Sequence, residues 1–162
     1  MKFIPSHDSR WQPVGGEDGP QMHPKPADHS LLTLEQWHAV RGHWPTGLAT
    51  ALTLVNTADV EGLADDLDRL ALIVLHFPKW TDGRAYSQAR LLRARLRFGG
   101  ELRASGDVLV DMLPLLARTG FDAVQLRHDQ SEASARRALG LVSAHYQGDT
   151  LNPRPIFSRF AT

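Results

Sequence analysis

The chain of 162 residues balances 18 Lys and Arg against 18 Asp and Glu, so net charge gives no overall attraction to nucleic acid or an anionic membrane. It contains no cysteine, which excludes disulfides, thiolate metal sites, Cys-ligated iron–sulfur clusters and a cysteine nucleophile. Residues 1–10 lack a basic flank followed by an apolar segment, and the longest apolar run, 70–77, is too short to span a bilayer. We therefore expect a cytoplasmic protein of one domain.

The two ends of the chain differ in composition from the middle. Residues 1–30 are rich in proline and glycine and poor in aliphatic side chains, which is typical of an arm that cannot fold alone. One short helix is predicted after Thr33, a suitable N-cap, and ends at Gly42. The predicted organisation is an N-terminal arm with one short helix at 1–45, an α/β domain at 46–147 and an extended C-terminal tail at 148–162.

After Pro45, an apolar run of strand length, a few turn residues and a segment of helical period follow one another four times. The second run is unbroken, as in strands covered by helices on both faces. Pro114 falls inside the third helix and is predicted to kink it. The predicted strands are 48–55, 72–77, 101–105 and 121–126, and the helices after them begin near Asp59, Arg84, Asp107 and Ser131, the last one running to about Tyr146.

Strands that alternate with helices through short connections predict right-handed crossovers. The fold class is therefore α/β, with four consecutive βα units forming a mainly parallel sheet flanked by helices and a non-regular N-terminal arm. Strand order is not readable from the sequence, so an open doubly wound sheet and a half-barrel both remain open.

In such sheets ligands bind beyond the carboxyl ends of the strands, where helix N-termini present free N–H groups. Fixed cations at the predicted edge can surround an anion or an acidic partner surface. The simpler interpretation of each is an ordinary solvated side chain. The predicted anion-binding or docking residues are Lys79, Arg84, Arg103, Arg127 and Gln88.

The turn after the second strand, residues 77–88, is the densest part of this edge. Pro78 stops the strand ladder, and Gly83 is predicted to adopt a backbone conformation closed to other residues. Asp82 and His76 are the candidate acid/base residues, and no catalytic residue is fixed by a motif. Asp82 can equally belong to a plain turn.

Other signals carry little chemistry. The histidines show no metal-ligand spacing, so no metal site is predicted, and no nucleotide-binding motif or other cofactor signature is present. Residues 90–97 form the most basic run, which on a helix spreads over the outer surface as a solvated face or a docking patch. The balanced charge also argues against nucleic-acid binding.

Three segments resemble hallmarks of the bacterial family called domain of unknown function 934: residues 77–93 (FPKWTDGRAYSQARLLR), 100–108 (GELRASGDV) and 117–122 (ARTGFD). The resemblance covers roughly residues 45–146. Trp80 stands where the family commonly has another aromatic residue, and Ala85 where it commonly has glycine. Family members are typically encoded beside assimilatory sulfite reductase and are labelled probable oxidoreductases involved in sulfite reduction, which implies the same pathway here.

Two functions follow from these observations. The first is an accessory protein of sulfate or sulfite reduction that docks on sulfite reductase or its electron donor through a basic surface, with Arg84 and Arg93 as the residues whose charge reversal tests it. The alternative is a small enzyme or carrier that binds a sulfur oxyanion or a phosphorylated metabolite at the carboxyl ends of the strands. A homodimer that buries the same edge is a third hypothesis.

Overall fold

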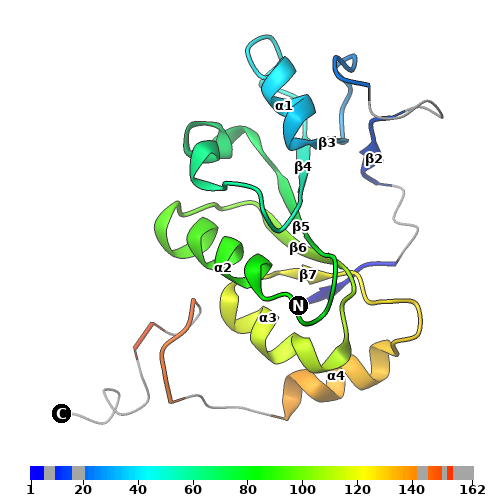
Figure 1. The fold of residues 1–162 in the computed structure, drawn as a ribbon, viewed down its shortest axis with the longest axis vertical. Coiled ribbons are helices and arrows are strands. Elements are labelled where there is room, and N and C mark those ends of the chain that lie inside the picture. Colours follow the sequence, from blue (N-terminus) through cyan, green and yellow to red (C-terminus); the bar gives the residue numbers. More distant parts are fainter. Residues whose placement is uncertain (6–9, 16–20, 142–145, 151–152, 155–162) are drawn as a thin grey trace.

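A computed structural model of the chain describes all residues except 6–9, 16–20, 142–145, 151–152 and 155–162. Its centre is an all-parallel, seven-stranded sheet with the order β1-β7-β6-β5-β4-β3-β2 (Figure 1). The strands are β1 Lys2–Phe3, β2 Gln12–Pro13, β3 Ser30–Thr33, β4 Thr50–Leu54, β5 Leu72–Phe77, β6 Glu101–Gly106 and β7 Ala123–Val124.

The helices lie between consecutive strands, except α4, which follows the last strand. They are α1 Leu34–Val40, the 3₁₀ helix η1 Glu61–Arg69, α2 Arg84–Arg90, the π-helical continuation η2 Leu91–Arg95, the 3₁₀ turn η3 Val110–Met112, α3 Leu113–Thr119 and α4 Glu132–Gly140. In the part of the chain that the structure describes, no helix is long and apolar enough to cross a membrane.

From β2 to β7, each strand lies beside the next strand in the sequence, and β1 is added at the far edge beside β7. A doubly wound sheet reverses direction at a switch point, and this order does not. The predicted α/β class is confirmed, and the strand order is that of an opened βα-barrel rather than of a doubly wound sheet.

The two faces of the sheet are covered differently. The main core joins helices to one face, and it contains fully buried Leu52, Ile73 and Leu75. The opposite face carries a second, smaller cluster of Ala51, Leu72 and Val74, against which Trp11 of the arm packs. Figure 1 shows α2 to the left of the strands and the segment with β2 to the right. The strand 72–77 is thus buried on both faces, but the arm rather than a second helix layer covers one of them.

The predicted short helix is confirmed as α1. The Thr33 hydroxyl accepts a hydrogen bond from the Gln36 N–H at 3.2 Å, and the Gln36 side chain accepts one from the Thr33 N–H at 2.8 Å, which together form a capping box. The arm also contributes β1, β2 and β3 to the sheet, so it holds more regular structure than its composition predicts. These short strands form hydrogen bonds with other strands of the sheet: β1 pairs with β7, β2 with β3, and β3 with β4.

Two predictions about the helices are wrong. Pro114 lies in the first turn of α3, where the N–H groups have no intrahelical acceptor to lose, and not in the middle of a helix, so the reason for the predicted kink is absent. Asp107 does not begin a helix, since the helical turns start at Val110 and its carboxylate binds elsewhere. The last predicted helix is observed as α4, and its expected extension over 142–145 lies outside the described residues.

Candidate functional site

The turn between β5 and α2 lies at the carboxyl edge of the sheet. The Asp82 N–H donates to the Lys79 carbonyl oxygen at 3.0 Å, which closes the turn before α2 begins at Arg84. Gly83 has φ −83° and ψ 0°, a conformation that other residues also adopt, so the special backbone role predicted for it is wrong.

Gly106, at the end of β6, is the glycine that this edge requires. Its φ is +92°, and a Cβ placed on it would lie 2.4 Å from the Phe77 carbonyl oxygen and 2.7 Å from Cε1 of His76. The next residue, Asp107, donates its N–H to the same Phe77 oxygen at 2.8 Å. The left-handed turn therefore lets the end of β6 close tightly on the end of β5.

Asp82 links three segments of the edge. Its carboxylate accepts hydrogen bonds from Nδ2 of Asn56 at 2.7 Å and from Nη2 and Nε of Arg84 at 2.6 and 3.0 Å. The guanidinium of Arg84 is the main reason that the pKa of Asp82 falls from 3.8 to about 2. Asp82 is therefore ionised at neutral pH and has no proton to donate, which weighs against its candidate role as a general acid.

Asp107 and Arg127 form a second bridge across the edge. One Asp107 oxygen accepts a hydrogen bond from the backbone N–H of Trp80 at 2.9 Å, and the other accepts one from Nη1 of Arg127 at 2.7 Å. The Trp80 N–H and the Arg127 guanidinium both lower the pKa of Asp107. Arg127 also holds Asp129 through two contacts of 2.7 Å, and the two carboxylates raise its pKa. The Arg127 guanidinium is thus committed to carboxylates of the protein itself.

The structure does not bring all four predicted cations together. Arg103 lies within β6 rather than after it, and its Nε and Nη2 bind Oε1 of Glu101 at 3.1 and 2.9 Å on the same strand. Lys79 is exposed, and its ammonium has no hydrogen bond or ion pair to any residue that the structure describes. Arg84 and Arg127 reach the carboxyl edge, where each is already paired.

Gln88 and His76 also differ in accessibility. Gln88 is 6% exposed, and its Nε2 donates to the carbonyl oxygens of Val55 and Ala58 at 3.0 and 2.9 Å. It ties the loop after β4 to α2, and its burial weighs against the predicted docking role of Gln88. His76 is exposed, and its Nδ1 lies 3.5 Å from Oγ of Ser105, its register partner on β6.

Arg93 has a structural role that its place in the basic run does not reveal. Its guanidinium donates to the carbonyl oxygens of Gly120 at 2.9 Å and Gly100 at 2.8 Å and pairs with the Asp122 carboxylate, while its side chain is 16% exposed. It therefore fastens the end of the helix to the segments that lead into β6 and β7. Arg93 is therefore poorly placed to bind a partner, because its guanidinium is occupied by carbonyl and carboxylate oxygens of the same chain.

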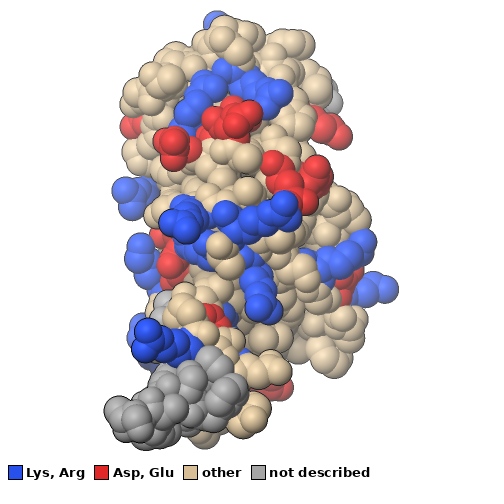
Figure 2. Space-filling view, turned by 90° about the vertical axis from the view of Figure 1, so that its left-hand side faces the viewer, with Lys and Arg blue, Asp and Glu red and all other residues tan. Residues whose placement is uncertain are grey.

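Three other arginines of the α2–η2 helix and the residues after it face outward, and we call them the basic band. Arg90 and Arg97 are exposed, and their guanidinium groups have no hydrogen bond or ion pair with any described residue. Arg95 is 69% exposed and pairs with Glu61 at 2.6 Å. Figure 2 shows Lys and Arg side chains gathered across the middle of the side of the molecule where this helix ends. The predicted outward spread of the run 90–97 is correct for all its arginines except Arg93.

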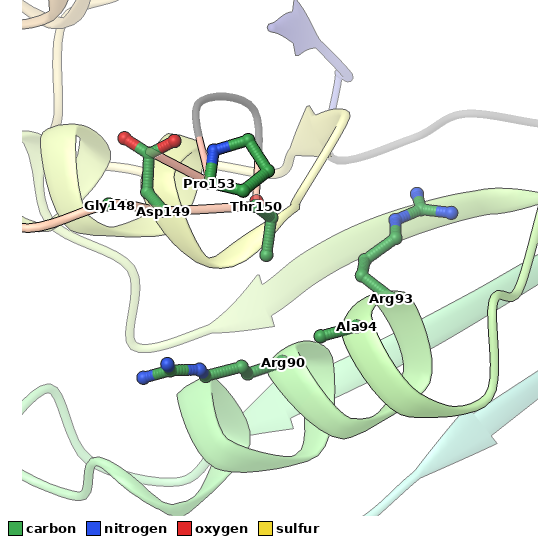
Figure 3. A pocket seen from close by; sticks show the side chains of 7 residues that line it. All are labelled: Arg90, Arg93, Ala94, Gly148, Asp149, Thr150 and Pro153. Carbon is green, nitrogen blue, oxygen red and sulfur yellow. The ribbon is translucent and has the colours of Figure 1, made fainter. Parts of the chain in front are cut away.

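A shallow cavity of about 370 Å³ adjoins the basic band, between the helix and the tail (Figure 3). Arg90 and Arg93 point in different directions there, while Asp149 and Thr150 lie across from them. Thr150 donates through its N–H and hydroxyl to the Arg118 carbonyl oxygen at 3.1 and 2.8 Å, which fixes this part of the tail. The cavity therefore does not direct two cations onto one ligand.

The fold and surface define a class of protein: a parallel α/β domain. Hydrogen bonds and ion pairs join the loops at the carboxyl edge of its sheet, and one helix presents arginines to the outside. The chain belongs to the family described as bacterial protein of unknown function (DUF934), which matches residues 51–157. The match runs from β4 past α4 and includes both the carboxyl edge and the basic band. Comparisons with curated proteins and with solved structures found no match.

Proposed function

We propose that this protein is an accessory component of assimilatory sulfate or sulfite reduction, which docks on sulfite reductase or its electron donor through the basic band. The pathway rests on the family, whose members are typically encoded beside sulfite reductase. The docking surface rests on one observation, the exposed and unpaired state of Arg90 and Arg97 among the described residues. Unpaired surface cations steer association with acidic proteins and set its salt dependence.

The alternative, an oxyanion site at the carboxyl ends of the strands, receives less support from the geometry. Arg84 and Arg127 would have to release Asp82, Asp107 or Asp129 before they could bind a ligand anion. Arg103 is 10% exposed and paired with Glu101. The arrangement favours docking because Lys79 is the one predicted cation of the edge whose side chain has no partner among the described residues, whereas Arg90 and Arg97 are both exposed and unpaired there on or just after the helix.

Copurification with sulfite reductase at low salt tests the proposal. The variant R90E/R97E is expected to weaken binding about tenfold or more, because two attractive charges become repulsive. The matched control is K25E/R137E, which changes the charge equally at two exposed positions elsewhere and should leave binding nearly unchanged. Equal retention of both variants on the reductase would contradict the proposed surface, and no binding of the wild type would contradict the proposed partner.

A further inference from the structure

The carboxyl edge exposes two large apolar side chains. Trp37 and Trp44 are buried, whereas Trp80 exposes 55% of its surface in the turn after β5. Val55, which directly follows the neighbouring strand β4, is 59% exposed. An exposed indole and a second exposed apolar side chain that follow neighbouring strands favour an interaction surface, because tryptophan is among the residues most enriched at the energetic centres of protein interfaces.

The turn that carries Trp80 is held rigidly. The Trp80 N–H is bound by Asp107, which Arg127 fixes in turn, and Asp82 ties the other end of the turn to Asn56. A side chain presented by a fixed backbone loses little freedom on binding. The edge therefore offers a preformed apolar anchor.

The charges around this anchor indicate what it binds. The turns at this edge set Lys79, Arg84 and Arg127 against Asp82, Asp107 and Asp129, so the two signs balance. A balanced surface gives no net attraction to a strongly acidic or basic partner. It is self-complementary, because across a two-fold axis each Lys79 ammonium can meet a carboxylate of the other copy, and Asp129 is 46% exposed.

We infer that this edge is the interface of a homodimer, with Trp80 and Val55 of each copy at its centre. A stable dimer buries roughly 800 Å² on each copy, so the contact must also include the loops after β4, β5 and β6. The basic band comes from the α2–η2 helix and the residues after it, and none of its arginines belongs to this interface. The inference is therefore independent of the proposed docking function.

Sedimentation equilibrium of the full chain tests this inference over roughly 1 to 200 µM. The wild type is expected to be dimeric within this range, and W80A should raise the dimer dissociation constant about thirtyfold, as removal of a central anchor does. L115A is the matched control, because Leu115 is an apolar side chain that is 44% exposed on α3. It should dimerise like the wild type, and so should R90E/R97E.

A wild type that stays monomeric throughout the range overturns the inference, as does a W80A variant that dimerises like the wild type. Circular dichroism of W80A shows whether its fold is intact. The variant K79E provides a second route that leaves the apolar anchor in place, and it should also weaken the dimer, since it removes the cation that faces the other copy.

Discussion

The arginines of the carboxyl edge and those of the basic band are in opposite states. Arg84 and Arg127 each bind carboxylates of the same chain at 2.6 to 2.7 Å, whereas Arg90 and Arg97 contact none among the described residues. Arg84 and Arg127 stabilise the loops of the edge, whereas Arg90 and Arg97 are available to bind a partner. The comparison shows that a local excess of arginine does not define a binding site until the intramolecular partners of each guanidinium are known.

Replacing Arg93 should cause the largest loss of stability. Its guanidinium is bound within the fold, whereas Arg90 on the same helix has an exposed side chain. R93A leaves the carbonyl oxygens of Gly100 and Gly120 without their donor and separates Asp122 from its cation. We expect a loss of about 3 kcal/mol in the free energy of unfolding, measured by urea denaturation.

The variant R90A is the control, and it should stay within about 0.5 kcal/mol of the wild type because it removes only an exposed side chain. If R93A and R90A lose similar amounts of stability, the distinction between bound and free arginines on this helix does not hold.

Gly106→Ala should be the next most damaging change. The new Cβ would meet the Phe77 carbonyl oxygen at 2.4 Å in a left-handed backbone conformation, which we expect to cost about 2 kcal/mol of stability. At Gly83, where φ is negative and the nearest atom to an added Cβ is 3.8 Å away, the same substitution should change stability by less than about 1 kcal/mol. Thermal denaturation of both variants measures the difference, and equal melting temperatures would show that the close approach at Gly106 is unimportant.

Low pH should reduce the free energy of unfolding, because protonation of Asp82 breaks its ion pair with Arg84. Its pKa in the folded protein, about 2, lies below the ordinary value of 3.8, so its stabilising contribution is complete above about pH 4 and is lost as the pH falls toward 2. The free energy of unfolding of the wild type should therefore fall more steeply between pH 4 and pH 2 than that of D82N. A similar series for D65N, which alters an exposed carboxylate with no described partner, should retain the steep fall. Equal slopes for wild type and D82N would contradict the assigned ion pair.

The sequence predicted those parts of the fold that depend on nearby residues. The apolar run of β5 and the cap of α1 are both local signals, and both are confirmed. The strand order is not local, because it depends on which distant segments exchange hydrogen bonds. The two-residue strands β1 and β2 were missed for the same reason, since β1 pairs with β7, more than a hundred residues away.

The location of the candidate site was predicted from the sequence, but the hydrogen bonds and ion pairs between its residues were not. The turn with Asp82 and Arg84 does lie at the carboxyl edge, as the strand-to-helix pattern indicates. Arg93 was not recognised as a clamp because its main acceptors are backbone carbonyl oxygens, which leave no sequence signature. The only local signal for the tight turn at Gly106 is a Ser-Gly-Asp segment after a strand, and that pattern alone does not specify its φ.

The most direct test of the docking proposal is the affinity for purified sulfite reductase as a function of salt concentration, measured by interferometry for the wild type and R90E/R97E. We expect wild-type binding to weaken as salt rises and the variant to bind about tenfold or more weakly at low salt, with the two affinities approaching each other at high salt. Identical affinities and identical salt dependence for the two proteins would contradict the role of the basic band.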